Sequence, residues 1–404
     1  MVVGCSIAFV SHSVDIPTEE IITRANNLRK NNKFKESEAL FKEATSSCSV
    51  TDSGNLTLSL ASLKSKQDIC AKAHSGYGIL LMLKSKFNQA EEQYSQAQSL
   101  LSEEDGFAAE IWANRALNFT FLNHFDAAEL YTKKAIDFFE NSDSYLQYTA
   151  ELVALYNNQG LFLRKLGKRE AAQQSFLDAI DLDENPNSEN YATKLFNLAV
   201  EYYVLFDYQE SEQTAKEAIK ILENLNKSTG VYGLLHGLLG QIEHRRGNYP
   251  AAKKLNQLGL AILRDISAGI NSGHADILIN VARDQINPDQ AETYYKKAVS
   301  IYLKIFPSSP NERIMKGYQE FGDFLNQQGR FTEAEESYAK ADQNAKANPQ
   351  YETDWVGAGA LKASRAKNLC DLQRFNQGLL MIQDAMDMME TNYGKSNEKY
   401  ARYF

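Results

Sequence analysis

The segment Tyr156–Ile180, YNNQGLFLRKLGKREAAQQSFLDAI, decides the fold of this chain. Its pattern is that of two helices joined by a turn, with Gly160 in the first helix and Ala172 twelve residues later in the second. Ala179 follows seven residues after Ala172, and Phe176 lies between them, one helical turn beyond Ala172. Small residues on paired helices let two backbones approach closely, as stacked helical hairpins require.

The same spacing recurs along the whole chain. The small residue of the second helix is found at nine positions, and successive copies are 38 to 44 residues apart after a first interval of 53. These positions are Ser37, Ala90, Ala128, Ala172, Ser211, Ala252, Ala291, Ala334 and Gly378. Twelve residues before each, eight of the nine copies hold Ala or Gly, and Ile279 is the exception. A fixed period of this length is typical of a repeat array.

Glycines and prolines mark the turns of the repeats. Gly167, Gly247 and Gly329 are placed to end first helices in a left-handed C-cap. Pro250 and Pro288 fall at the starts of second helices, where the missing N–H is tolerated. No proline falls inside a predicted helix, so the pattern predicts an all-α chain of helical hairpins.

The pattern resembles the tetratricopeptide repeat (TPR), in the longer variety found in kinesin light chains. The segment YATKLFNLAVEYY, from Tyr191 to Tyr203, is similar to the first helix of that variety, and the resemblance covers roughly Thr18 to Thr391. It implies a right-handed α-solenoid superhelix of stacked antiparallel helix pairs, in which the first helices line a concave groove.

The domain organisation follows from the repeat positions. We expect an N-terminal tail over 1–16, a single array of about nine repeats over 17–391, and a cap or truncated repeat over 392–404. The first interval of 53 residues predicts an insertion or a lengthened helix around 50–73. The seventh repeat lacks the turn glycine and the aromatic residue that precede most second helices.

Composition narrows the classes of function. With 43% hydrophobic and 24% charged residues, the chain is a folded rather than a disordered protein. Its net charge of -9 disfavours nucleic acid as a partner, because binding to phosphates requires clustered cations. No apolar run approaches the roughly 20 residues of a membrane span.

The four cysteines and the N-terminus bear on the cellular compartment. Cys5, Cys48, Cys70 and Cys370 are far apart and form no CxxC motif, which argues against a disulfide framework and a zinc site. We expect most of them to be idle or buried thiols in a reducing compartment, so that the protein is cytoplasmic. The alternative is an exported lipoprotein, if VVGC at 2–5 is the end of a truncated lipoprotein signal.

Motifs for catalysis, cofactors and metals are missing from the sequence. It has no GxGxxG, GxxxxGK[ST], GxSxG or HExxH. His236 and His244 lie two helical turns apart, but no third ligand is near them in the sequence, which favours a solvated or satisfied pair over a metal site. We therefore expect a protein that is not an enzyme and binds neither cofactor nor metal.

The candidate binding residues lie on one stripe of the first helices. Three consecutive repeats carry an asparagine two residues before the small residue: Asn114, Asn158 and Asn197. An amide can both donate and accept, so a row of amides can pair with the backbone of an extended peptide. In the resembled family, asparagines at this site commonly do so. The alternative is that these amides cap helices or link one helix to the next.

Further polar residues are expected on the same stripe. They are Asn157, Arg164, Tyr203, Gln241, His244, Arg245, Asn280 and Arg283. The three arginines would favour an acidic residue or a C-terminal carboxylate in the bound peptide, because guanidinium pairs well with carboxylate. The alternative is that these long cations only solvate a helix face.

Three functions are compatible with these features. The first, which we favour, is a non-catalytic scaffold that binds a peptide or helical segment of a partner protein in the concave groove. The second is the solenoid subunit of a larger transport, secretion or motor-type assembly. The third is a regulator that senses a peptide or a small molecule, although no pocket-like cluster of polar residues stands out in the sequence.

Overall fold

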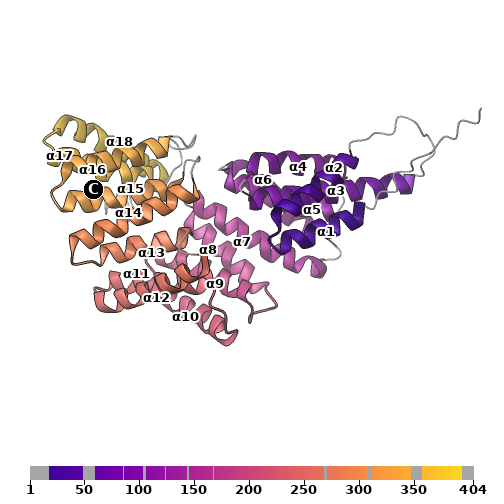
Figure 1. Cartoon of the computed structure of the whole chain (residues 1–404), viewed down its shortest axis with the longest axis horizontal. Helices are drawn as coiled ribbons and strands as arrows, with labels where there is room; N and C mark the ends of the chain where they lie inside the picture. Colours follow the sequence, from indigo (N-terminus) through magenta and orange to yellow (C-terminus); the bar gives the residue numbers. More distant parts are fainter. Residues whose placement is uncertain are drawn as a thin grey trace, which may run out of the picture. The chain divides into compact units, whose positions relative to one another are not determined.

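In the computed structural model the chain is all-α (Figure 1). The structure describes residues 18–48, 60–84, 86–102, 106–122, 124–142, 145–166, 168–267, 271–306, 311–346 and 357–393. These residues form 18 α-helices and one short 3-10 helix, and they contain no strand. None of the described helices is both long and apolar enough to cross a membrane.

The chain divides into two compact units, 1–148 and 149–404. The first unit holds three antiparallel helix pairs, α1 with α2, α3 with α4 and α5 with α6, followed by the 3-10 helix η1. The bounds are α1 Thr18–Lys30, α2 Phe34–Cys48, α3 Leu60–Leu83, α4 Phe87–Ser99, α5 Gly106–Phe121, α6 Phe125–Glu140 and η1 Tyr145–Tyr148.

The second unit stacks six further pairs, from α7 with α8 to α17 with α18 (Figure 1). The bounds are α7 Thr149–Lys165, α8 Arg169–Asp181, α9 Glu189–Val204, α10 Tyr208–Asn224, α11 Gly230–Arg245, α12 Tyr249–Ser267, α13 Ser272–Arg283, α14 Pro288–Ile305, α15 Glu312–Gln327, α16 Phe331–Lys346, α17 Ala358–Asp371 and α18 Phe375–Tyr393. The predicted solenoid of antiparallel helix pairs is therefore confirmed within each unit.

The domain limits predicted from the sequence can be compared with the structure only in part. The tail expected over 1–16 lies outside the described residues, as does most of the segment expected to cap the array over 392–404. The division into two units falls between the third and fourth helix pairs. A single array over 17–391 stays a prediction.

Close approach of the two helices in a hairpin is visible at the predicted small residues. The Ser37 hydroxyl donates to the Ala25 carbonyl oxygen at 2.8 Å, and the Ser211 hydroxyl donates to the Ala199 carbonyl oxygen at 2.8 Å. Both serines and both alanines are fully buried. The twelve-residue spacing thus brings the second helix against the backbone of the first.

The large residue one turn later packs inside its own hairpin. A Cβ built on Gly160 would lie 2.5 Å from the Phe176 ring, and Gly78 and Gly322 face Tyr94 and Tyr338 in the same way. Such rings also pack against the next hairpin. Phe41 of α2 faces Gly76 of α3, and the Tyr295 ring of α14 lies 5.2 Å from the Phe324 ring of α15.

Five of the described turns between paired helices share one backbone geometry. Gly247 and Gly329 have φ of 79° and 75°, which confirms the predicted left-handed C-caps, while Gly167 lies outside the described residues. The equivalent position has positive φ in three other hairpins, where it is held by Asn32, Phe206 and Gln373. Glycine is therefore favoured at this position but is not required.

Helix starts confirm the two proline predictions. Pro288 is the first residue of α14 and Pro250 is the second residue of α12. In the seventh hairpin, which lacks the turn glycine, Asn287 caps α14 by accepting from the backbone N–H groups of Asp289 and Gln290. Thus α13 ends at its C-cap Asp284 without a glycine, and the Asn287 side chain begins α14.

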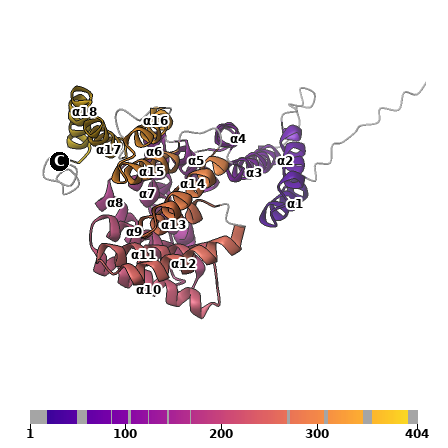
Figure 2. The same cartoon turned by 60° about the vertical axis from the view of Figure 1, so that its left-hand side comes forward.

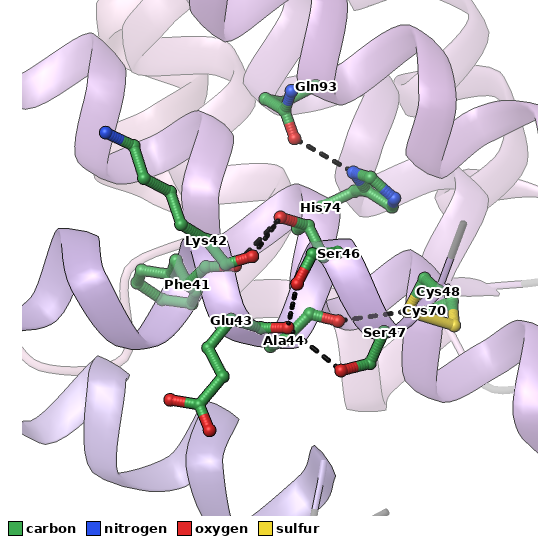
Figure 3. Close-up of a disulfide and its surroundings, with 11 residues drawn as sticks. Phe41, Lys42, Glu43, Ala44, Ser46, Ser47, Cys48, Cys70, His74 and Gln93 are labelled. Carbon is green, nitrogen blue, oxygen red and sulfur yellow. Dashed lines mark hydrogen bonds between the residues drawn. A yellow bond between two sulfur atoms is a disulfide. The ribbon is translucent and has the colours of Figure 1, made fainter. Parts of the chain in front are cut away.

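The long first interval is explained by α3, which is 24 residues long. Cys70 in this helix is joined to Cys48 at the end of α2 by a disulfide (Figure 3). Our expectation of idle thiols is corrected for these two residues. Their separation of 22 residues follows no motif, and only the packing of α3 on α2 brings their Cα atoms to 5.6 Å.

A polar cavity on the first helices of the second unit

The first helices of successive hairpins lie side by side in the second unit. α9 contacts α11, α11 contacts α13, and α13 contacts α15, as Figure 2 shows for α9, α11 and α13. Near the C-terminal ends of α9, α11 and α13 their side chains surround a cavity of about 220 Å³. It is lined by Tyr203, Gln241, His244, Arg245, Asn256, Asn280, Arg283, Asp284 and Glu320.

The sixth hairpin contributes a buried amide to the lining of the cavity. Asn256 lies four residues after Ala252, which is the position that holds Phe176 or Tyr338 in other hairpins. Its side chain packs against Gly240 and is fully buried. An amide fills less space than an aromatic ring, and it also carries polar atoms into the interior. The Asn256 amide nitrogen donates to Asp284 at 3.1 Å.

One ion pair and one histidine–carboxylate hydrogen bond lie inside the cavity. Arg283 donates to the carboxylate of Glu320 through Nε and Nη2, and His244 pairs through Nδ1 with Asp284, whose side chain is 2% exposed. Burial alone would lower the pKa of Arg283 and raise that of Glu320. The charge of each partner outweighs burial, so the pKa of Arg283 is raised and that of Glu320 is lowered. This pair therefore stays ionised.

Three groups in the cavity retain unused hydrogen-bonding capacity, and one of them is the buried amide oxygen of Asn256, which has no partner among the described residues. Asn280 is 7% exposed, and its amide oxygen accepts from Arg283 at 3.2 Å, but its amide nitrogen has no partner among the described residues. Arg245 donates through Nε to the Tyr203 hydroxyl at 3.2 Å and forms no ion pair with any described residue. Buried donors without partners are uncommon, because each lost hydrogen bond costs about 1–3 kcal/mol.

Five predicted site residues meet in this one cavity: Tyr203, His244, Arg245, Asn280 and Arg283. Gln241, placed on the same stripe, also lines it. Three further lining residues, Asn256, Asp284 and Glu320, lie outside the set predicted from the sequence, in which no pocket-like polar cluster stands out. The signal for Asn256 was present, because an amide replaces an apolar or aromatic residue at a repeated core position.

Other predicted site residues are engaged elsewhere in the second unit. Asn197 donates to the Asn157 side chain at 3.0 Å, which links α9 to α7. Asn157 also lines a second cavity of about 500 Å³ near the starts of α7 and α9. Arg164 pairs with the fully buried Glu201, and it donates to the Asn197 carbonyl oxygen at 2.8 Å. Its charge is therefore balanced within the fold.

The side chains of the remaining two asparagines of the predicted row make no hydrogen bond to another described residue. Asn158 is half-buried in α7, and Asn114 is half-buried in α5 of the first unit. Two asparagines outside the predicted row have a structural role. Asn118 donates to the Phe87 carbonyl oxygen at 3.0 Å, and Asn368 donates to the Phe331 carbonyl oxygen at 3.0 Å. At this register, two residues after the small residue, the amide links a first helix to the preceding hairpin.

Metal-binding geometry is not found in the described part of the chain, where no group of three or more His, Cys, Asp or Glu side chains could hold an ion. His236 is 8% exposed and packs edge-on against Tyr232, with a ring-centroid distance of 4.7 Å. It is thus buried away from His244, which pairs with Asp284. The two histidines do not act as a pair in this structure.

Comparison with known proteins supports the fold. A tetratricopeptide repeat family model matches residues 153–186, which contain most of α7 and all of α8. The chain therefore carries a tetratricopeptide repeat in the hairpin that includes Tyr156–Ile180. A search of curated protein sequences finds no match.

Solved structures with a similar fold are helical repeat proteins. The apo form of RapI has a TM-score of 0.56 at 18% identity, covering 69% of this chain and 98% of RapI. The apo quorum sensor NprR from B. thuringiensis has a TM-score of 0.55 at 16% identity, covering 93% and 99%. A Rap protein complexed with competence and sporulation factor has a TM-score of 0.55 at 12% identity, covering 83% and 99%. The predicted TPR-like fold is confirmed.

Proposed function

We propose that this protein is a non-catalytic binding protein that holds a peptide segment of a partner protein along the first helices of the second unit. The cavity between α9 and α15 is the anchor for one acidic group of that segment. A single observation carries the proposal: the buried amide nitrogen of Asn280 and the unpaired guanidinium of Arg245 line the same cavity.

Charge balance supports an acidic anchor. Arg283 is neutralised by Glu320, whereas Arg245 lines the same cavity and forms no ion pair with a described residue. One carboxylate would neutralise Arg245 and accept a hydrogen bond from Asn280. Such charge-assisted hydrogen bonds are roughly twice as strong as neutral ones. The Asp or Glu side chain of a peptide, or its C-terminal carboxylate, meets this requirement.

Cavity size supports a peptide side chain over a free metabolite. The volume of about 220 Å³ lies below the roughly 300–1,000 Å³ of typical small-molecule pockets. The neighbouring first helices offer further polar side chains beside the cavity, so a longer ligand gains contacts that a small molecule does not. Helical repeat arrays bind extended segments along such surfaces.

A second candidate is a regulator that senses a short peptide. Two observations support it. The chain shares its fold with the quorum sensor NprR and with a Rap protein that was solved in complex with competence and sporulation factor, and it has a polar cavity. The two functions differ in the size of the ligand. A sensor is stabilised by a free oligopeptide alone, whereas a scaffold requires a segment within a partner protein.

The test is affinity capture with mass spectrometry on three forms of the full chain. Arg245→Ala/Asn280→Ala removes the two unused donors, and Arg246→Ala is the matched control. Arg246 follows Arg245 directly but pairs with Glu212 and Glu243 outside the cavity. All three forms are first shown to have equal helicity and melting temperature.

We expect partners to be lost from Arg245→Ala/Asn280→Ala and kept by Arg246→Ala. A synthetic peptide spanning the captured segment should then bind the wild-type chain, and it should bind less well when its acidic residue is changed to the amide. Partners that remain bound to both variants would refute the cavity as the anchor. A parallel capture with Asn114→Ala/Asn158→Ala/Asn197→Ala tests the predicted asparagine row separately.

A further inference from the structure

A groove in the second unit lies away from the two cavities described above. Its volume is about 440 Å³, and it lies between the second helices α14 and α16, with α15 contributing to its floor. Glu320 and Phe321 are neighbours in α15, yet Glu320 lines the polar cavity and Phe321 lines this groove. The groove and the polar cavity share no lining residue, so the groove is a separate site from that of the proposed function.

The floor of the groove is apolar. It is formed by Val299 and Leu303 of α14 and by Tyr318 and Phe321 of α15. Leu303 is 42% exposed, although large aliphatic side chains are usually buried. Burial of apolar surface contributes about 25 cal/mol per Å², so a ligand that covers this floor with its own apolar side chains would gain stability.

The rim of the groove is cationic. Lys296, Lys304 and Lys340 line it, and no carboxylate does. Lys296 is paired with Glu292, but Lys304 and Lys340 form no ion pair with a described residue. The Lys340 ammonium instead lies 6.0 Å from the centre of the Tyr318 ring. This local positive charge contrasts with the net charge of -9 of the chain.

We propose that this groove binds an acidic amphipathic segment of a partner protein. Its apolar side chains would rest on the floor, and its carboxylates would face Lys304 and Lys340. An amphipathic helix laid into a groove with anchors at i, i+3, i+4 and i+7 is a common mode of peptide recognition. Nucleic acid and anionic membrane are disfavoured as occupants, because the acidic remainder of the chain repels an extended polyanion.

A simple alternative is that the lysine stems merely cover the apolar floor, as long cationic side chains often do. The open volume of about 440 Å³ argues against this, because stems that covered the floor would fill it. That volume also falls within the usual range of roughly 300–1,000 Å³ for ligand pockets. The lysines thus border the floor without closing it.

The test uses fluorescence anisotropy with the full chain and a labelled synthetic peptide. The peptide has about 16 residues, with leucine at i, i+3, i+4 and i+7 and glutamate at most other positions. Lys304→Glu/Lys340→Glu reverses the charge of the rim. Lys253→Glu/Lys254→Glu is the matched control, because these two exposed lysines in α12 carry the same charge change away from the groove. Leu303→Ser tests the floor.

We expect the wild-type chain and Lys253→Glu/Lys254→Glu to bind the peptide equally. Lys304→Glu/Lys340→Glu should weaken binding at least tenfold, or about 1.4 kcal/mol, and Leu303→Ser should weaken it several-fold. The proposal would be overturned if Lys304→Glu/Lys340→Glu bound the peptide as tightly as the wild-type chain did. It would also be overturned if the wild-type chain bound a peptide with lysine in place of glutamate equally well, or bound no peptide at all. If the chain bound no peptide but sedimented with phosphatidylserine vesicles, and this sedimentation depended on Lys304 and Lys340, the occupant of the groove would be a membrane surface and not a partner segment.

Discussion

Asn256 of α12 packs against Gly240 of α11, so a buried amide lies where other hairpins hold an aromatic ring against glycine. The same amide donates to Asp284, which pairs with His244 at the polar cavity. A difference at one repeated core position thus links the packing of the sixth hairpin to the candidate binding site. It also makes the site sensitive to the residue at position 240.

Gly240→Ala should destabilise the chain by about 1–3 kcal/mol, because the added methyl group would overlap the Asn256 side chain. The shift of Asn256 should also disturb its hydrogen bond to Asp284. Urea unfolding monitored by circular dichroism measures the effect. Gly230→Ala is the control, since its nearest neighbour, Leu263 Cδ2, is 4.0 Å from the added atom. Equal stability of the two variants would contradict the packing of Asn256 on Gly240.

Ala172→Arg should disrupt the fourth hairpin. Ala172 is fully buried in α8, and an arginine there must either displace the neighbouring helix or bury an unpaired charge. We expect a loss of about 3 kcal/mol or more. Ala171→Arg, at an exposed position of the same helix, should change stability little. Unchanged melting and helicity of Ala172→Arg would show that the helix-contact assignment is wrong.

Acid should destabilise the second unit through two buried histidines. His236 and His274 are 8% and 2% exposed, and neither ring makes a hydrogen bond within the described residues. Burial lowers the pKa of both imidazoles below the ordinary value of 6.5. The unfolded chain then binds more protons than the folded chain below pH 6.5. Stability is therefore complete above this pH and falls as the pH drops towards the lowered folded pKa values.

Urea midpoints measured at several pH values between about 7.5 and 5 test this expectation. His236→Gln/His274→Gln should flatten the fall below pH 6.5, whatever its stability at neutral pH. Asp323 works in the opposite direction. Burial raises its pKa to about 6, so its contribution to stability grows as the pH falls through 6. An unchanged pH profile in the double histidine variant would contradict the role of these residues.

Reduction should destabilise the first unit. The Cys48–Cys70 disulfide links residues separated by 22 positions, and closing a loop of this size contributes about 3 kcal/mol. Thermal unfolding with and without a reducing agent, repeated on Cys48→Ser/Cys70→Ser, measures the contribution. Cys370→Ser serves as the control, because Cys370 is a free cysteine in the second unit. Insensitivity of the wild-type chain to reductant would count against the crosslink.

Gln373→Gly should stabilise the last described hairpin. Gln373 has a φ of 62° and an exposed side chain. The left-handed conformation costs a non-glycine residue about 1–2 kcal/mol, and the flexibility of glycine in the unfolded chain offsets part of the gain. We expect a net gain of about 0.5–1 kcal/mol. Gln377→Gly, within the helical φ range of α18, should instead be destabilising. Chemical unfolding of both variants decides the sign.

Much of the fold could be predicted because its signals are local. Ala25 with Ser37 and Ala199 with Ser211 are each twelve residues apart, and a single hairpin brings them together. The disulfide between Cys48 and Cys70 could not be predicted in this way. It depends on the packing of α3 against α2, and the sequence between the two cysteines carries no motif for it.

The candidate site was only partly predictable for the same reason. Periodicity placed Arg164, Arg245 and Arg283 on one stripe. It could not show which of these three arginines is paired with a carboxylate in the fold. Arg164 is balanced by Glu201, 37 residues away, and Arg283 by Glu320, also 37 residues away. Among the described residues, Arg245 has only the hydroxyl of Tyr203 as a side-chain partner. The difference lies in the partners that neighbouring hairpins supply.

The sequence by itself determined the helical hairpins, their order and the stripe of polar residues on the first helices. These properties depend on residue spacing within about 20 positions, and the geometry of a helix translates that spacing directly into faces. Only the tertiary structure decided which polar groups are satisfied and which are left with unused donors. That outcome depends on contacts between hairpins about 40 residues apart, such as His244 with Asp284 and Arg283 with Glu320, and no local pattern specifies them.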